Sequence, residues 1–185
     1  MTRVLVPLAH GCEELEAVTV IDLLRRAEID VTTAGLTAGA VTASRGTVLL
    51  PDTTLDAVVG EAFDMIVLPG GLPGARYLEE DARLRAMLLR QQAAGRFLAA
   101  ICAAPRVLAA AGLLDGRRAT CYPGAIDPAA FPLVQLTAAP VMLDGTLITG
   151  RGPGTALDFA LQLIESLAGR ATRDRVELGL VREPG

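Results

Sequence analysis

The stretch FLAAICAAP, residues 97–105, decides the fold class of this 185-residue chain. It opens with a short, wholly apolar run, which is typical of a strand buried on both faces in a parallel sheet. Cys102 follows the run, and we expect a helix of about ten residues next, with Pro105 near its start and Gly112 at its close. Small neighbours such as Ala103 permit a tight turn between the two elements. The pattern therefore predicts a nucleophile-elbow cysteine.

Strand and helix patterns alternate along the rest of the chain. Residues 3–8 (RVLVPL) and 64–69 (DMIVLP) are predicted as further buried strands. A helix is predicted over 13–27, with apolar positions at Leu15, Val18, Leu23, Leu24 and Ala27. The other expected elements are a strand at 30–36, a strand pair around Arg45 and Gly46, a helix at 81–95, strands at 117–122 and 133–137, a hairpin at 140–150, a long helix at 154–169, and a short helix within 173–185 whose end is loose. This alternation predicts an α/β fold in which helices cover both faces of a mainly parallel sheet.

The composition favours one domain, spanning residues 1–185, around an aliphatic core. Hydrophobic residues make up 51% of the chain and aromatic residues only 3%, so Ala, Val, Leu and Ile must fill the interior. The net charge of −4 gives no general attraction to nucleic acid or to an anionic membrane. No apolar stretch reaches the ~18 residues of a membrane span, so we expect a soluble, cytoplasmic protein that binds neither nucleic acid nor a membrane.

The cysteines and the histidine are too few, and too irregularly spaced, for a disulfide framework or a zinc site. Cys12, Cys102 and Cys121 are odd in number, which argues against a disulfide framework. His10 is the single histidine, and a zinc site is not expected with so few ligands. We therefore expect free thiols and no metal.

Three turns directly follow predicted buried strands, at residues 9–16 (AHGCEELE), 68–74 (LPGGLPG) and 101–105 (ICAAP). Ligands of open α/β sheets bind beyond the carboxyl ends of the strands, so the side chains of these turns are expected to meet in one crevice. Glu16, one turn inside the first helix, is the candidate partner of Cys102. Its helical position between Leu15 and Val18 suggests that it leans toward the crevice.

We expect Cys102 and Glu16 to share a proton. The amino end of the following helix would lower the pKa of Cys102, and a protonated Glu16 would donate to its sulfur. The alternatives are a small buried hydrophobic residue for Cys102 and a solvated acid for Glu16. Gly70 and Gly71 can turn backbone N–H groups toward an anion, although a doubled glycine is more often just a tight connection.

Together, four segments resemble the ThiJ/PfpI superfamily, and specifically the clade of the Parkinson-disease protein deglycase and bacterial YajL: AHGCEELEAV (9–18), LPGG (68–71), AAICAAP (99–105) and TGRGPGTALDFAL (149–161). The resemblance implies a flavodoxin-like three-layer sandwich that forms a homodimer. It implies that Cys102 is the reactive cysteine, that Glu16 is its protonated partner, and that Gly70 and Gly71 are backbone donors at the pocket. No metal or organic cofactor is implied.

Other positions match the family in part. Arg45 and Arg151 match basic positions beside the pocket and the dimer interface, or they form surface salt bridges. Asp22 and Arg26 can pair with each other at their i, i+4 spacing or reach across that interface. Tyr122 stands where many members carry a histidine, which makes histidine-dependent mechanisms doubtful, while its phenol can still donate to an oxyanion.

The remaining residues of the three turns receive no catalytic role. Ala103 lines the pocket where peptidase relatives have a histidine, so peptidase activity is not expected. His10 is interpreted as an exposed loop residue. Cys12 and Cys121 are interpreted as small packing residues.

Two functions remain open at this point. The first is a cysteine-dependent, cofactor-free glyoxalase or deglycase that acts on small 2-oxoaldehydes, converting methylglyoxal to lactate, or on early glycation adducts. The second is a non-catalytic oxidative-stress sensor or redox-regulated chaperone that works through oxidation of Cys102.

Overall fold

In the computed structural model, which describes residues 2–182, seven strands form the central sheet in the order β10-β11-β7-β6-β1-β2-β5. All neighbouring pairs in this described sheet are parallel except β10 with β11, which form an antiparallel hairpin. The strands are β1 (Arg3–Leu8), β2 (Asp30–Gly35), β5 (Thr53–Thr54), β6 (Met65–Leu68), β7 (Phe97–Ile101), β10 (Val141–Asp144) and β11 (Leu147–Gly150).

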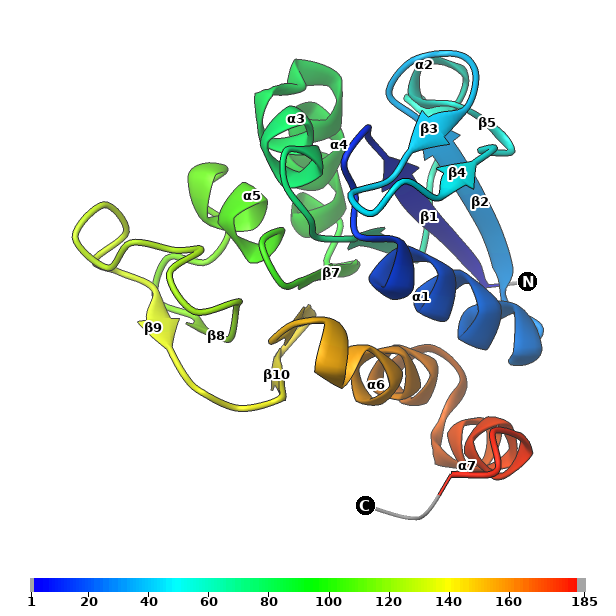
Figure 1. The fold of residues 1–185 in the computed structure, drawn as a ribbon. Helices are drawn as coiled ribbons and strands as arrows, with labels where there is room; N and C mark the ends of the chain where they lie inside the picture. Colours follow the sequence, from blue (N-terminus) through cyan, green and yellow to red (C-terminus); the bar gives the residue numbers. More distant parts are fainter. Residues whose placement is uncertain (1, 183–185) are drawn as a thin grey trace.

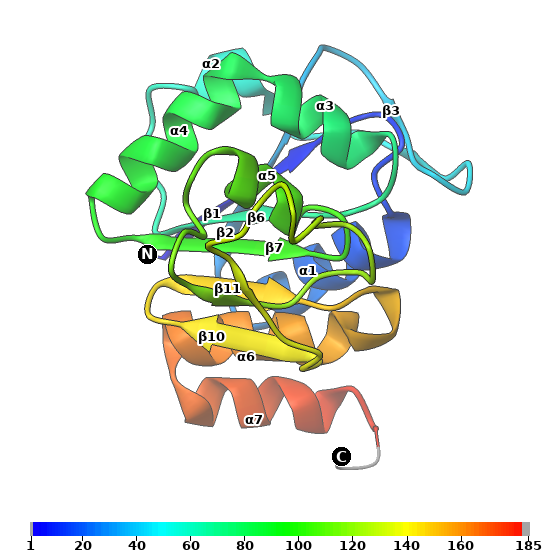
Figure 2. The ribbon, with the colours of Figure 1, turned by 90° about the vertical axis from the view of Figure 1, so that its left-hand side faces the viewer.

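Helices cover both faces of this sheet, as Figure 2 shows. One face carries α1 (Glu14–Arg26) and α6 (Ala156–Ala168), which contact each other, and α7 (Arg170–Gly179) packs outside α6. The other face carries α2 (Leu55–Val58), α3 (Gly74–Glu80), α4 (Ala82–Ala93) and α5 (Pro105–Ala110). The architecture is the flavodoxin-like α/β sandwich that the sequence predicts.

The helices begin and end where local chemistry dictates. Asp81 caps α4, since its Oδ1 accepts from the amides of Arg83 at 2.9 Å and Leu84 at 3.1 Å. Gly95 follows the same helix with a φ of +66°, a left-handed conformation that favours glycine. The expected helix closure at Gly95 is therefore confirmed.

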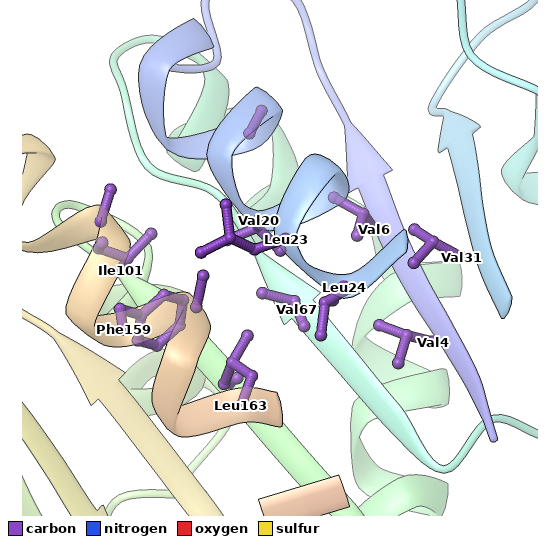
Figure 3. Close-up of a cluster of buried hydrophobic side chains, with 14 of the residues drawn as sticks. Val4, Val6, Val20, Leu23, Leu24, Val31, Val67, Ile101, Phe159 and Leu163 are labelled. Carbon is purple, nitrogen blue, oxygen red and sulfur yellow. The ribbon is translucent and has the colours of Figure 1, made fainter. Parts of the chain in front are cut away.

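The core between α1, α6 and the sheet is aliphatic, as the composition predicts. Val20, Leu23 and Leu24 of α1 and Phe159 and Leu163 of α6 lie in one buried cluster over the strands (Figure 3), and each of the five is at most 2% exposed. Two apolar positions assigned to this face are wrong: Leu15 is 51% exposed and Val18 is 45% exposed. The α1 surface over the core therefore starts with Glu16 and Ala17 instead.

Several elements differ in length from the sequence prediction. The expected strands at 117–122 and 133–137 shrink to β8 (Arg118–Ala119) and β9 (Gln135–Leu136), which pair with each other outside the central sheet. The helix after Cys102 has six residues, and α2 and α3 were not predicted. The strand pair around Arg45 is confirmed as β3 (Val41–Thr42) with β4 (Val48–Leu49). The predicted tail helix corresponds to α7, and the expected loose end at 183–185 lies outside the described residues.

The order of the strands locates the crevice. The chain runs from β1 outward to β2 (Figure 1) and later returns to β6 on the other side of β1, so the connections leave β1 in opposite directions. Ligand sites of such sheets lie at this switch point, beyond the carboxyl ends of the strands. The turns after β1, β6 and β7 all end there. Across residues 2–182, no helix combines the length and the apolar character needed to cross a membrane.

Candidate active site

Cys102 occupies a sharp turn directly after β7. Its φ is +64°, a left-handed conformation that costs about 1–2 kcal/mol for a residue with a side chain. Two backbone hydrogen bonds hold the turn: the Cys102 amide donates to the Gly150 carbonyl at 3.0 Å, and the Cys102 carbonyl accepts from the Tyr122 amide at 2.8 Å. The residue is 8% exposed, so part of it remains accessible. This geometry matches the expected elbow.

Glu16 lies in the first turn of α1 and is completely buried. Its backbone amide donates to the Glu13 side chain at 2.8 Å, which caps the helix. Its carboxyl Oε2 accepts from the Gly70 amide at 2.8 Å, whereas Oε1 has no hydrogen-bond partner among the described residues. Glu16 thus points inward, as expected, although its exposed neighbours Leu15 and Val18 do not do so.

Gly70 is the point at which the two candidate residues meet. A Cβ atom built on Gly70 would lie 2.6 Å from the Cβ of Cys102 and 2.7 Å from Oε2 of Glu16. It would also lie 2.8 Å from the carbonyl oxygen of Ile101. Contacts below 3.0 Å are not tolerated, so only glycine fits here, and the three turns do converge in one place.

Burial raises the pKa of Glu16 to about 7, against hydrogen bonds from Cys102 and from the Gly70 amide that lower it. Burial likewise raises the pKa of the Cys102 thiol, and the neighbouring Glu16 carboxylate raises it further, to about 12. The expectation that the helix end lowers this pKa is therefore wrong. That helix, α5, has only six residues and begins at Pro105, and burial together with the Glu16 carboxylate outweighs the amides that favour the Cys102 thiolate.

The pair is electrostatically coupled, because each group responds to the charge of the other. When Glu16 is protonated, its repulsion of a thiolate disappears and its O–H can donate to the sulfur. The amides of Gly71 and Ala103 also favour the thiolate by hydrogen bonding. The two side chains are therefore arranged to hold one proton between them at a pH above about 7.

The two glycines have different roles. Gly71 directs its amide to Cys102, in line with the expected backbone donor. The amide of Gly70 is directed to Glu16, so it is not the free pocket donor that the sequence suggested. Its bond fixes the position of the carboxyl group instead.

A cavity of about 610 Å³ lies next to the elbow. Its wall includes Ala103 beside Cys102, Leu72 beside Gly71, and Tyr122, whose ring is part of a side chain that is 53% exposed. The charged residues Arg76, Glu79 and Arg106 also line it, and none of them was singled out from the sequence. Arg76 and Glu79 lie at i, i+3 on α3, a helix that the sequence analysis did not predict, and Arg106 lies on α5.

None of the four other candidate residues forms a hydrogen bond or an ion pair with Cys102 or Glu16 among residues 2–182. Arg26 pairs with Asp22 at 2.7 Å on α1, which is the mutual pairing that their i, i+4 spacing allows. The Arg45 amide donates to the Glu14 carboxylate at 2.9 Å in the turn between β3 and β4, and its side chain has no ion pair among residues 2–182. Arg151 lies close enough to Cys121 to lower the pKa of that thiol, which burial raises.

His10 and the two other cysteines take no part in the pair. His10 is exposed, as expected, and its Nδ1 accepts from the Thr42 amide at 3.1 Å. Cys12 and Cys121 are free and buried, and burial raises the pKa of Cys12 to about 11. Their interpretation as packing residues agrees with their membership of the two buried clusters.

Comparisons with known proteins agree on one family. The model of the DJ-1/PfpI family matches residues 2–166. Protein dj-1beta of Drosophila melanogaster is 45% identical over 178 residues, covering 96% of this chain and 95% of that protein. Glutathione-independent glyoxalase DJR-1.2 of Caenorhabditis elegans is 34% identical over 160 residues, covering 86% and 85%. The solved structure of oxidized Toxoplasma gondii DJ-1 matches with a TM-score of 0.93 and 38% identity over 100% of both chains.

Proposed function

The chain belongs to the DJ-1/PfpI family, and from this premise we propose that it is a cofactor-free, cysteine-dependent enzyme of the glyoxalase or deglycase type. Its substrates would be small 2-oxoaldehydes such as methylglyoxal, which it would convert to lactate, or early glycation adducts of these aldehydes. The observation that carries the proposal is the buried Glu16 carboxyl beside Cys102, fixed by the Gly70 amide. The name of the C. elegans relative supports the same class of reaction.

The first step is addition of the Cys102 sulfur to the aldehyde carbon of methylglyoxal. The thiol proton passes to the Glu16 carboxylate as the S–C bond forms, and Glu16 then delivers this proton to the former aldehyde oxygen. The product is a hemithioacetal. The Tyr122 hydroxyl, at the cavity wall, can donate a hydrogen bond to the oxygen while it carries negative charge.

The second step moves a hydrogen between adjacent carbons. Glu16 removes the proton from the carbon bonded to sulfur and returns it to the neighbouring carbonyl carbon, while the hydroxyl proton of the hemithioacetal moves to the former ketone oxygen, which gives a thioester of lactate on Cys102. Water then breaks the S–C bond, releasing lactate and restoring the thiol. A carboxyl with a pKa of about 7 suits both proton transfers, because it accepts and donates near neutral pH.

The test measures methylglyoxal loss and lactate formation together. We expect Cys102→Ser and Glu16→Gln each to lower kcat/KM by about 100-fold or more. Cys121→Ser is the matched control, because it removes another buried thiol that takes no part in the pair, and it should retain the wild-type rate. Equal rates in all four proteins would refute the catalytic role of the pair.

A second candidate function is sensing of oxidants, as proposed from the sequence. Peroxide would transfer one oxygen to the Cys102 sulfur and leave as water, and a second peroxide would give the sulfinate. The unpartnered Oε1 of Glu16 favours this product, since its protonated form can donate to a sulfinate oxygen. The intact mass of the protein after mild peroxide treatment distinguishes the enzyme from the sensor. A gain of two oxygens at Cys102 with negligible aldehyde turnover would favour the sensor.

The homodimer also remains a proposal. Exposed apolar residues gather where α1 meets the segment around β4: Val18 and Leu50 line one depression, and Leu15 and Val48 are 51% and 63% exposed nearby. A face of this kind on the surface favours association. Leu50→Glu should shift a dimer toward monomer in sedimentation analysis, whereas the exposed Leu178→Glu on α7 should not. A wild-type protein that sediments as a monomer would contradict the proposal.

A further inference from the structure

The cavity beside Cys102 is larger than the proposed small substrate requires. Its volume of about 610 Å³ lies in the range of pockets that hold drug-sized ligands, roughly 300–1,000 Å³. A three-carbon aldehyde would leave most of this space to water. An aldehyde bound to Cys102 would lie at the end of the cavity that Ala103, the next residue in the chain, lines, so the remainder has room for whatever the aldehyde is attached to.

The charged groups of the wall are not equivalent. Arg106 and Glu79 form an ion pair with Nε–Oε2 at 2.8 Å and Nη2–Oε1 at 3.4 Å, which ties α5 to α3. The Glu79 charge is thus already neutralised within the wall. Among residues 2–182, Arg76 pairs with Glu80 at 3.8 Å, with both side chains more than 60% exposed, and its guanidinium also lies over the Tyr77 ring at 5.4 Å from the centroid. Such an exposed pair at this distance contributes little, so the Arg76 guanidinium is available to a ligand.

The rest of the wall is apolar, with Leu72, Pro73, Ala75 and Ala125 among its residues. A guanidinium at the edge of an apolar cavity binds carboxylate oxygens well, since it offers paired N–H donors and partial exclusion of water strengthens the attraction. Two arginines against one glutamate leave a net positive wall on a chain whose net charge is −4. The cavity therefore differs in sign from the protein as a whole.

We infer that this cavity selects 2-oxoaldehyde adducts that carry a carboxylate. Arg76 recognises the carboxylate group, and the Arg106–Glu79 pair holds the walls formed by α5 and α3 in position. This inference rests on the proposed function, because it assigns the carrier group of the same substrate. Adducts of free amino acids and of small carboxylated thiols belong to this class, and neutral adducts of the same size do not.

The test compares two matched substrates, the hemithioacetals of methylglyoxal with N-acetylcysteine and with its neutral amide. The readout is the ratio of their kcat/KM values. The wild type should prefer the carboxylate. Arg76→Gln should reduce that preference about fivefold, and Glu79→Gln should increase it, because the wall then loses its only negative charge.

Arg175→Gln is the charge-matched control for Arg76→Gln, since Arg175 is exposed on α7 and far along the chain from the cavity. It should leave the preference at the wild-type value. An identical preference in the wild type, Arg76→Gln and Glu79→Gln would overturn the inference, and so would a wild type that favours the amide.

A binding experiment separates this inference from the proposed function. The Cys102→Ser protein is titrated with the stable thioether N-acetyl-S-(2-oxopropyl)cysteine and with its amide, in the wild-type and Arg76→Gln backgrounds. The inference is supported if the carboxylate thioether binds more tightly than its amide and if Arg76→Gln abolishes this difference. This holds even if the wild type turns over no aldehyde. Equal binding of the two thioethers refutes the inference even if turnover is fast.

Discussion

The backbone amide of Gly70 donates a 2.8 Å hydrogen bond to Oε2 of Glu16 in the interior of the protein. The bond joins the turn after β6 to the first turn of α1 and holds the carboxyl group beside Cys102. The other carboxyl oxygen, Oε1, is left without a hydrogen-bond partner among the described residues. The protonation of Glu16 therefore controls both the charge of the site and the stability of the fold around it.

The first prediction concerns stability. The pKa of Glu16 is about 7 in the folded protein against 4.5 for an ordinary glutamate, so the folded state binds this proton more tightly than the unfolded state does. The stabilisation is complete below pH 4.5 and is lost as the pH rises through 7. At about 1.4 kcal/mol per pKa unit, the wild type should lose about 2–3 kcal/mol between pH 5 and pH 8 from this group.

Urea unfolding at the two pH values checks this prediction. Glu16→Gln cannot titrate, so its free energy of unfolding should lack this decline, and the difference between the two proteins should change by the same amount. Glu80→Gln, which removes the charge of a side chain that is 65% exposed, serves as the control, and its free energy of unfolding should change with pH as that of the wild type does. A wild-type advantage over Glu16→Gln that is independent of pH would contradict the assignment.

The second prediction concerns the close approach at Gly70. An alanine Cβ would come within 2.8 Å of the Cys102 Cβ, Glu16 Oε2 and the Ile101 carbonyl oxygen. The carbonyl oxygen and the Cys102 Cβ cannot move away without a shift of the backbone. Gly70→Ala should destabilise the protein by about 1–3 kcal/mol and displace the carboxyl group. Gly60→Ala is the control, because a Cβ there meets nothing within 4 Å. Equal stability and equal aldehyde turnover in both variants would be inconsistent with this geometry.

The third prediction concerns Glu14, which anchors the turn between β3 and β4. Its carboxylate accepts from the amides of Arg45 at 2.9 Å and Thr47 at 3.3 Å and from the Ser44 hydroxyl at 3.0 Å. These bonds outweigh burial and lower the pKa of Glu14 to about 2. In Glu14→Gln, the amides of Arg45 and Thr47 should exchange with solvent severalfold faster. Unchanged exchange at both amides would show that the turn holds its shape without the carboxylate.

The buried strands and the helices α1, α4 and α6 follow from apolar periodicity, but the inward position of Glu16 does not. Leu15 and Val18 are more apolar than Glu16, and yet they face outward. A helical pattern ranks residues by hydrophobicity and takes no account of a hydrogen-bond donor that lies 54 residues further along the chain. Glu16 does point inward, as expected, but the reasoning from its apolar neighbours was wrong, because Leu15 and Val18 are exposed.

The short strands β8 and β9 have a similar explanation. The amide of Thr120 donates to the Thr149 hydroxyl at 2.9 Å, and its own hydroxyl donates to the Ala139 carbonyl at 2.8 Å. Side chains therefore satisfy backbone groups that a longer strand would have paired. Local sequence patterns reveal β-branched residues but not these long-range partners.

The pKa of Cys102 is a third point that the sequence could not supply. Position after a strand and before a helix suggested a lowered value, but the helix is short and the sulfur is buried against a carboxylate. Only the distances among Cys102, Glu16 and Gly70 reveal that the two side chains titrate as a pair.

The rate of Cys102 alkylation by iodoacetamide as a function of pH, followed by peptide mass spectrometry, tests the shared proton most directly. The wild-type rate should rise with an apparent pKa near 7, where the pair loses its first proton, and Glu16→Gln should lack this transition and react only as an isolated buried thiol at higher pH. Profiles that coincide in the two proteins would contradict the account, since the ionisation of the sulfur would then be independent of the carboxyl group.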